Sequence, residues 1–428
     1  MKSRLSEKNK VFLYMLAAMV LGYLPWYNFS AVSKYIAAEF SLTVNQTGII
    51  MASFQAGYVV VVLVTGWLAD RVGERKVVAW ATLCTAIFST LFAFLAKDFT
   101  SILILRLITG LSAGAIYIPG MALLSSWFPP DERGRVLGAY TGALTLAYAG
   151  GYFVAAPIAA AYNWRYGMLW TSLPAFIAAF IVFFLVKEKP SDMFENVKAV
   201  QRIKGEQEIQ KSAPGKEYAG PILITTGYMG HMWELYTFWG WIGPFMVACS
   251  LASGYDEAQA VAIGGQLAAF IILLGVPSVW LAGIAADKIG RTKTIIVCAF
   301  SSLIMEFFFG YLYGKSLAIV VIVGLWIGFW VVADSAIYKA GMTEMVNREI
   351  RATALGVESA FGYFMTILSP FIFGKVLDRM NLGIKDATLA TNWGLPFLIL
   401  GAGALLAPVS IFILRRLPQA KLMSNGKM

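Results

Sequence analysis

The sequence predicts an all-α membrane protein, with twelve transmembrane helices arranged as two pseudo-symmetric six-helix bundles. Composition is the first observation: apolar residues make up 59% of the chain and charged residues 14%, against roughly 25% charged residues in soluble domains. The second is that apolar runs repeatedly reach the about 20 residues that cross a bilayer as a helix. The third is that one polar pattern occurs in each half of the chain, which indicates an internal duplication.

The expected helices follow the apolar runs along the chain. In the first half we expect them at 11–33, 46–68, 76–96, 99–125, 135–160 and 166–187. In the second half we expect them at 219–249, 259–282, 293–313, 316–343, 352–376 and 392–415. The chain therefore divides into an N-terminal bundle over 1–187, a C-terminal bundle over 219–428 and a polar linker over 188–218, which we place on the cytoplasmic surface.

The basic residues predict the orientation of the chain. Most of the 34 Lys and Arg residues fall in segments on the side of the N-terminus, so the positive-inside rule places both termini in the cytoplasm. We expect a multi-pass protein of the cell (inner) membrane, surrounded by the lipid bilayer. This asymmetry, and not a nucleic-acid partner, explains the net charge of +10. The three cysteines form neither a disulfide framework nor a metal-ligand pattern.

The repeated pattern is Gly-x-x-x-Asp-x-x-Gly, and each copy lies between two apolar runs. Its candidate residues are Gly66, Asp70, Arg71, Gly73 and Arg75 in the first copy, and Gly283, Asp287, Gly290 and Arg291 in the second. Glycine permits the positive φ of a tight turn, and the acid can accept hydrogen bonds at a neighbouring helix end. Shorter matches, Arg133 with Arg351 and Asn163 with Asn392, extend the duplication. A substrate would bind between the two halves, near the midplane.

With these motifs the sequence resembles the major facilitator superfamily across essentially the whole chain. The paired turns are similar to its signature between helices 2–3 and 8–9, and the run Arg106–Gly114 is similar to its helix 4 signature. The segments His231–Glu234 and Ala333–Ser335 resemble a bacterial branch described as cyanate-permease-like or nitrate/nitrite-transporter-like. The resemblance implies a transporter, not an enzyme, with a cavity lined by helices 1, 4, 7 and 10. The expected helices 2 and 8 lack the arginines of nitrate carriers, which counts against nitrate.

The resemblance also implies a gate on the cytoplasmic side. In the superfamily the acid of the turn engages the loop after helix 4 and the start of helix 11. We therefore expect Asp70 to pair with Arg133 or to cap the helix near Arg351, and Glu358 is a further candidate for this gate. The alternative is that the charged turns only anchor the topology.

Four ionisable residues inside the apolar runs are candidates for substrate binding or proton coupling, because charge inside a membrane helix is costly. Arg106 is expected to bind a substrate carboxylate, to take part in coupling, or to satisfy backbone carbonyls as a structural residue. His231 and Glu234 are three residues apart and share one helical face. Because the resemblance implies that helix 7 lines the cavity, we expect this face to point into it. A carboxyl and an imidazole there can exchange a proton, although a pair that only fixes helix packing is the alternative. Asp334 is expected to be an auxiliary carboxylate.

Two further charged residues and a set of aromatic residues complete the candidates. We expect Lys339 to snorkel to the interface, and Glu306 to have a structural or lipid-interface role because its helix is peripheral in the superfamily. Aromatic residues of the cavity helices are expected to line a site for an organic solute, although such residues also form interfacial belts. They are Tyr27, Tyr117, Trp233 and Trp330.

We therefore expect a secondary active transporter that works by alternating access and couples protons to the uptake of a small organic solute. An organic anion is favoured by the donors of Arg106 and Lys339. No cofactor or metal is expected, and the chain is expected to function as a monomer. Two alternatives stay open: a proton-driven exporter of amphipathic compounds, and a membrane sensor or scaffold that transports nothing.

Overall fold

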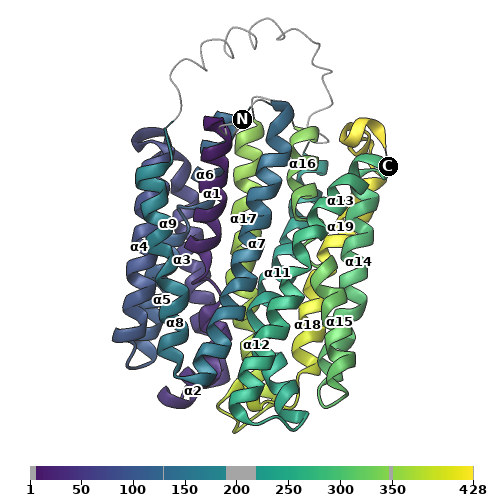
Figure 1. Ribbon diagram of the computed structural model, residues 1–428. Helices are drawn as coiled ribbons and strands as arrows, with labels where there is room; N and C mark the ends of the chain where they lie inside the picture. Colours follow the sequence, from purple (N-terminus) through teal and green to yellow (C-terminus); the bar gives the residue numbers. More distant parts are fainter. Residues whose placement is uncertain (1–5, 129, 189–217, 347–349, 428) are drawn as a thin grey trace, which may run out of the picture.

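The computed structural model describes residues 6–128, 130–188, 218–346 and 350–427, and these form helices and no strand. Figure 1 shows the long helices side by side, with both chain termini at the same end. We call this end the terminal face and the opposite end, where α2 lies, the far face. The first half denotes the described residues before the linker, and the second half those after it.

In the first half the helices follow the predicted runs. They are α1 (Glu7–Tyr23), α2 (Asn28–Phe40), α3 (Val44–Val72), α4 (Glu74–Leu95), α5 (Phe99–Ala113), α6 (Tyr117–Trp127), α7 (Pro130–Ala161), α8 (Trp164–Ser172), α9 (Pro174–Phe180) and the π-helix η1 (Ile181–Leu185).

The helices of the second half follow the remaining predicted runs, although they are divided at different places. They are α11 (Ala219–Ala252), α12 (Glu257–Leu273), α13 (Gly275–Ile289), α14 (Arg291–Phe309), the 3₁₀ helix η3 (Gly310–Leu312), α15 (Leu317–Trp330), α16 (Ser335–Met345), α17 (Arg351–Met380), the 3₁₀ helix η4 (Ala387–Leu389), α18 (Gly394–Ala404), α19 (Leu406–Arg415) and the 3₁₀ helix η5 (Pro418–Gly426).

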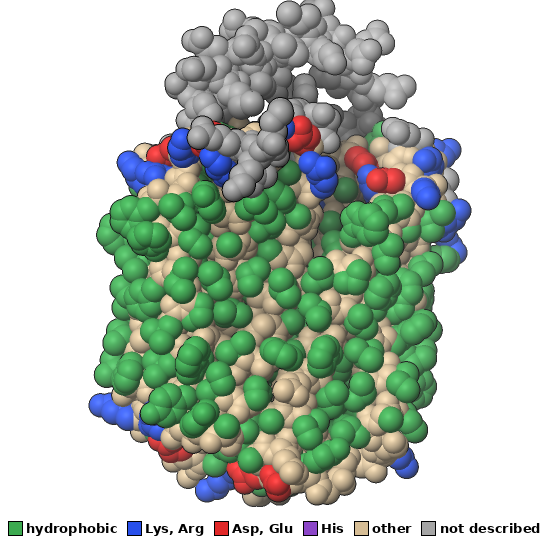
Figure 2. All heavy atoms as spheres, viewed as in Figure 1, with side chains coloured by type: hydrophobic (Ala, Val, Ile, Leu, Met, Phe, Trp, Pro, Cys, Tyr) green, Lys and Arg blue, Asp and Glu red, His purple; other side chains and the backbone are tan. Residues whose placement is uncertain are grey.

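Eleven of these helices or consecutive helix pairs are long and apolar enough to cross a membrane. The 29-residue helix α3 corresponds to the remaining predicted span. On the face seen in Figure 2, hydrophobic side chains cover the molecule between its two ends, and charged side chains gather at the ends. The predicted all-α membrane fold is confirmed.

Several expected spans are interrupted near their middle, which the apolar runs did not predict. The first breaks between α1 and α2, at residues 24–27, and continues to Phe40, beyond the expected end at residue 33. The fourth breaks between α5 and α6, and the tenth between α15 and α16. A break leaves backbone carbonyls without helical partners, which other groups must then satisfy.

The repeated turns have the predicted geometry. Gly73 ends α3 with φ of 98°, and Gly290 ends α13 with φ of 102°. These values lie in the region that residues with a side chain rarely adopt, so glycine at both positions has a physical cause. In each copy the next helix starts at the following residue, which gives the tight turn expected.

Each half also contains one close helix crossing that requires glycine. A methyl group at Gly110 would lie 2.0 Å from the carbonyl oxygen of Phe54, and one at Gly328 would lie 2.1 Å from that of Ile271. The first crossing joins α3 to α5, and the second joins α12 to α15. Small residues allow such close approach between membrane helices.

The two halves contact each other mainly along two pairs of helices. α3 packs against α17, and α7 packs against α12. Near the far face the first contact is tight, because a methyl group at Gly48 would lie 3.1 Å from the Cα atom of Gly374. The halves are therefore closed together at the far face.

Candidate functional site

A small enclosed cavity lies between the halves. Most of its lining residues come from the first half, and Tyr236, Gly240 and Pro370 come from the second. The free space is about 20 Å³. A water molecule needs about 10–15 Å³, so a larger solute requires the halves to separate. Two of the predicted site residues, Tyr27 and Arg106, line this cavity.

The break in the first membrane helix positions Arg106. Its Nη2 donates to the carbonyl oxygen of Trp26 at 2.9 Å, and its Nη1 donates to that of Pro25 at 3.2 Å. The guanidinium also lies 4.3 Å from the ring centroid of Phe54, a cation–π contact. Among the described residues no acidic side chain forms a salt bridge with Arg106, whose exposed fraction is 4%. Its positive charge therefore has hydrogen-bond partners but no counter-charge.

Aromatic rings form the walls around this cation. The ring of Trp26 lies 4.8 Å from Phe54 and 4.8 Å from Tyr58, measured between centroids. It also lies 6.2 Å from Tyr236 of the second half. Tyr27 stacks on Tyr152 at 6.0 Å. The cavity thus combines one buried cation with flat apolar surfaces.

A buried ion pair closes the far face across the two halves. Nζ of Lys34 on α2 lies 3.0 Å from Oδ2 of Asp386 and 3.9 Å from Oε1 of Glu257, both in the second half. The Lys34 side chain is 7% exposed. Thr388 donates its backbone N–H to Asp386 at 2.9 Å and so helps to hold the carboxylate in place. Sequence reasoning missed this contact, although a single lysine at the end of an apolar run was a usable signal.

Hydrogen bonds next to the cavity reinforce this closure. The hydroxyl of Tyr152 lies 2.7 Å from Oγ of Ser30 and 2.7 Å from the carbonyl oxygen of Trp239 in the second half. Ser30 in turn donates to the carbonyl oxygen of Gly240. Polar bonds and the Lys34 pair therefore tie the halves together on one side of the cavity.

A second polar cluster lies inside the second half. Nδ1 of His231 is 3.0 Å from Oδ1 of Asp334, and its Nε2 is 2.8 Å from Oγ of Ser335. His231 lies on α11, whereas Asp334 lies in the break between α15 and α16. The side chains of both partners are at most 3% exposed. The break in the tenth span thus presents a carboxylate to the only histidine of the chain.

Glu234 extends this cluster towards α14. Its carboxyl interacts with Ser302 and electrostatically with Glu306, both on α14. Glu306 is 0% exposed, and both of its carboxyl oxygens lack a hydrogen-bond partner. The expected lipid-interface role of Glu306 is therefore wrong, because its side chain points inward from a peripheral helix.

The shared face of His231 and Glu234 also differs from expectation. We expected it to look into the cavity between the halves, but it looks into the interior of the second half. α11 is surrounded on nearly all sides, because 89% of the residues in its membrane-spanning stretch are buried. The three-residue spacing therefore identifies a common face without identifying the neighbour that it meets.

Lys339 pairs with a residue that was expected at the gate. Its Nζ lies 3.1 Å from Oε2 of Glu358 and 2.8 Å from Oγ of Ser359, and it covers the ring of Tyr228 at 4.1 Å. Instead of extending alone to the interface, Lys339 ties α16 to α17. Glu358 is thus bound within the second half, and its gating role stays a prediction.

Three of the predicted cavity aromatics lie elsewhere. Tyr117 bonds to Thr141 at 2.9 Å within the first half. Trp233 donates to the carbonyl oxygen of Leu400 on α18 at 3.1 Å. Trp330 is partly exposed and contacts its neighbours Trp326 and Phe329. The positions of these aromatic residues on the expected cavity helices therefore did not predict the surface that each ring covers.

The signature turns bind different partners in the two halves. In the first, Nη1 of Arg75 donates to the carbonyl oxygens of Phe183 and Val186 at 3.3 and 3.2 Å. In the second, Arg291 bonds to Asp287 at 2.6 Å and to Glu344 at 2.9 Å.

Other members of the predicted gate have fewer described contacts. Arg71 covers the ring of Trp67 at 4.2 Å. Gly283 lies inside α13 with open space beside it, and Gly66 lies within α3. The side chains of Asp70, Arg133 and Arg351 lie outside the described part of the structure. The predicted pairing of Asp70 therefore stays a prediction.

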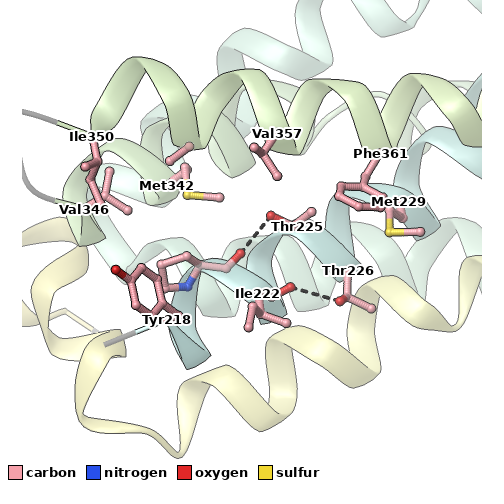
Figure 3. Close-up of a pocket in the computed structure, with 12 residues that line it drawn as sticks. Tyr218, Ile222, Thr225, Thr226, Met229, Met342, Val346, Ile350, Val357 and Phe361 are labelled. Carbon is pink, nitrogen blue, oxygen red and sulfur yellow. Dashed lines mark hydrogen bonds between the residues drawn. The ribbon is translucent and has the colours of Figure 1, made fainter. Parts of the chain in front are cut away.

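A larger pocket, of about 520 Å³, lies towards the terminal face between α11, α16 and α17 (Figure 3). Its lining is almost entirely apolar and belongs to the second half. Its two threonines, Thr225 and Thr226, donate to carbonyl oxygens of their own helix at 2.8 and 2.9 Å. Apart from the hydroxyl of Tyr218, this lining offers almost no polar group to recognise a polar solute, and it carries no charge, so the cavity between the halves is the better candidate site.

Comparison with known proteins identifies the family. Residues 15–370 match the family described as Major Facilitator Superfamily. The chain belongs to the Major Facilitator Superfamily.

Solved structures of this superfamily agree with the fold. A bacterial homologue of the human lysosomal transporter Spinster superposes with a TM-score of 0.76 at 13% identity, covering 97% of this chain and 98% of that one. A D-xylose-proton symporter superposes with a TM-score of 0.72 at 17% identity, covering 97% and 99%.

Curated relatives in the superfamily are transporters. A hexuronate transporter of Bacillus subtilis (strain 168) is 25% identical over 393 residues, covering 87% of this chain and 89% of the relative. A putative niacin/nicotinamide transporter of the same organism is 25% identical over 315 residues, covering 73% and 75%. A probable sulfoacetate transporter of Cupriavidus necator is 22% identical over 433 residues, covering 96% and 95%. None of these three is described as a cyanate or nitrate carrier, and the branch expected from the sequence is not confirmed.

Proposed function

We propose that the protein is a secondary transporter that takes up a small organic anion by alternating access, coupled to protons. The observation that carries this proposal is the buried guanidinium of Arg106, which faces the cavity between the halves and has no acidic partner among the described residues. A positive charge at the centre of a membrane protein favours an anionic ligand. Relatives named for hexuronate and sulfoacetate, both organic anions, support this choice.

Alternating access follows from where the halves touch. The Lys34 pair and the Gly48–Gly374 contact close the far face, and the cavity between the halves holds only about 20 Å³. A solute can enter only if the halves move apart, and it can leave on the other side only if different contacts break. Such rigid-body motion about an interface is a common transport mechanism.

Proton coupling is assigned to the cluster around His231. An imidazole paired with a carboxylate can hold or release a proton near neutral pH. Glu234 and Glu306 add two carboxyl groups that form no salt bridge among the described residues. Uncompensated acids in a membrane interior mark proton pathways in many pumps and transporters. We propose that this cluster is loaded and unloaded with protons while Arg106 holds the anion.

The orientation of the chain defines which face opens to the outside, while the proton gradient sets the direction of net transport. The basic residues concentrate on the terminal face, and by the positive-inside rule this face lies in the cytoplasm. The far face, closed in this structure, then opens to the outside to admit the solute. We propose that the protein lies in the bacterial inner membrane and works as a monomer.

Flux measurements in proteoliposomes test the proposal. Labelled glucuronate, nicotinate and sulfoacetate are added outside at pH 5.5 with pH 7.5 inside, and internal label is followed over time. We expect accumulation of one or more of these anions above the external concentration, and its loss when a proton ionophore is added. Label leaving preloaded vesicles against its gradient would indicate an exporter. Ligand binding without flux under any gradient would indicate a sensor.

A further inference from the structure

The polar atoms that line the cavity have a strong bias towards donors. Trp26 Nε1, Tyr27 OH, Arg106 Nε and Gln55 Oε1 are buried and lack a hydrogen-bond partner. The first three can donate a hydrogen bond, and only the Gln55 oxygen is limited to accepting. A ligand that satisfies this set brings several acceptors and few donors. A carboxylate, with two oxygens and no N–H or O–H group, fits that requirement.

The rest of the lining offers flat aromatic surfaces from both halves. Trp26 and Phe54 come from the first half, and Tyr236 comes from the second. The centroids of Trp26 and Tyr236 lie 6.2 Å apart across the interface. Aromatic pairs interact favourably at about 4.5–7 Å, so a third ring placed between these two needs them about 9 Å apart, which requires the halves to separate by about 3 Å.

A polyhydroxylated acid fits this lining less well. Each sugar hydroxyl that becomes buried must donate to an acceptor or lose the hydrogen bond that it made with water. Ser30 already bonds to Gly240, so only the Gln55 oxygen and the Tyr27 hydroxyl remain as unpaired side-chain acceptors among the lining residues described above, too few for several sugar hydroxyls. A cationic ligand is disfavoured by the uncompensated charge of Arg106.

We infer that the ligand of this cavity is a planar monocarboxylate, an aromatic or heteroaromatic acid. Its carboxylate faces Arg106, and its ring lies between Trp26 of the first half and Tyr236 of the second. This inference rests on the proposed function, since it specifies which organic anion the interface accepts. A ligand bound in this way contacts both halves. Its binding therefore favours an arrangement in which the two halves close around the ligand.

Calorimetric titration of the full-length protein in lipid nanodiscs tests the inference with four small probes. Benzoate has the ring and the charge. Cyclohexanecarboxylate has the charge without a flat ring, benzamide has the ring without the charge, and glucuronate is a sugar acid. We expect the Kd of benzoate to be at least tenfold lower than that of each other probe.

Two variants and a control locate the ring contact. In Tyr236→Leu we expect benzoate affinity to fall at least fivefold with cyclohexanecarboxylate affinity unchanged, because the leucine side chain offers no face for stacking. Tyr236→Phe keeps a ring and should keep the preference for benzoate. Tyr162, which is 78% exposed, provides the control: Tyr162→Leu should change neither affinity.

The probes separate this inference from the proposed function. Equal affinity for benzoate and cyclohexanecarboxylate, or tighter binding of glucuronate, would overturn the planar-ring inference and leave anion transport standing. Equal affinity for benzoate and benzamide would overturn both. Selective benzoate binding without proton-driven benzoate flux would support the inference and count against coupled transport. Absence of benzoate binding would overturn the inference, whatever the flux of other anions.

Discussion

The first and second halves cross their helices in the same way but bury opposite charges. Gly110 lets α3 approach α5, and Gly328 lets α12 approach α15, so the scaffold is shared. In the first half the buried group at the cavity is Arg106, which donates to two backbone carbonyls and, at 3.5 Å, to the side-chain oxygen of Asn28. In the second half a histidine and carboxyl groups are buried away from the cavity, on α11, α14 and the break before α16.

This difference separates two tasks on one duplicated framework. A cation that faces the interface can hold an anion, and an acidic cluster behind the interface can hold protons without competing for the same space. The helix breaks make both possible. The break before α2 presents carbonyls to Arg106, and the break before α16 presents Asp334 to His231. The predictions below test this division of labour.

The largest expected effect is on anion binding when the first half loses its cation. In Arg106→Ala we expect the affinity for the transported anion to fall about 10- to 100-fold, since hydrogen bonds to charged groups contribute about 1.5–3 kcal/mol. Equilibrium binding by calorimetry measures this. Arg106→Lys should retain part of the affinity, and Lys97→Ala, at an exposed lysine in the same half, should retain all of it. Unchanged binding in Arg106→Ala would remove Arg106 from the anion site.

The matching change in the second half should alter coupling instead of binding. In Glu234→Gln we expect proton-driven accumulation to be abolished while exchange of labelled for unlabelled solute continues, because only the proton-carrying group is lost. Uptake and counterflow in the same proteoliposomes measure the two rates. Glu39→Gln, at a far-face acid paired with Arg165, is the control and should accumulate solute normally. Full accumulation by Glu234→Gln would assign proton handling to another group.

Replacing a buried charged residue with leucine should change the free energy of unfolding in opposite directions in the two halves. Glu306 has no partner for either oxygen, so Glu306→Leu should raise the free energy of unfolding by about 1–3 kcal/mol. Arg106→Leu should lower it, because the carbonyls of Pro25 and Trp26 lose their donors. Thermal unfolding in detergent measures both changes. A lower melting temperature for Glu306→Leu would show that Glu306 has a structural partner.

A smaller effect is expected where the halves meet at the far face. Lys34→Gln replaces a charge-assisted hydrogen bond to Asp386 with a neutral one, so the closed arrangement should lose about 1 kcal/mol, roughly fivefold in population. A cysteine introduced at Met51, a cavity residue that is 7% exposed, reports this as faster labelling by an impermeant maleimide from the far face. The variant with Met51→Cys and an intact Lys34 is the reference. An equal labelling rate in both would mean that the ion pair does not hold the far face closed.

The smallest effect should come from the second signature turn. Asp287 is 69% exposed and pairs with Arg291 across the turn at Gly290, and exposed ion pairs typically contribute about 0–1 kcal/mol. Arg291 also keeps Glu344 as a second partner. Asp287→Asn should therefore change transport less than twofold. Asp70→Asn, the equivalent change in the first copy, should impair transport far more than membrane insertion. Equal, small effects of the two substitutions would reduce both turns to topological anchors.

The sequence predicts the scaffold well because membrane helices have a simple physical requirement. Runs of about 20 apolar residues must be helical in a bilayer, and the positions of most helices follow from that alone. The turns at Gly73 and Gly290 follow from the repeated pattern. The helix breaks at residues 24–27 and before α16 were not predicted, because each interrupts one apolar run that is long enough to cross the bilayer. Pro25 was a usable signal for the first break.

The partners of the buried charges were harder to predict. Asp386 is 352 residues from Lys34, and no local pattern links two such distant positions. Glu306 was misplaced because its helix is peripheral, yet a peripheral helix still has one face towards the interior. For His231, spacing gave the companion on its own helix but not the aspartate on another. These contacts depend on the rotation of each helix, which uniform apolarity does not reveal.

The glycine crossings limit where this molecule can bend. With α3 locked against α5 and α12 against α15, each half resists internal distortion and turns as one block. When two rigid bundles move against each other, their interface fixes how far they rotate, and the bound solute only shifts the equilibrium between the two arrangements. Substitutions among the cavity residues can then change which solute is transported, without altering the helix packing or the motion of the two halves.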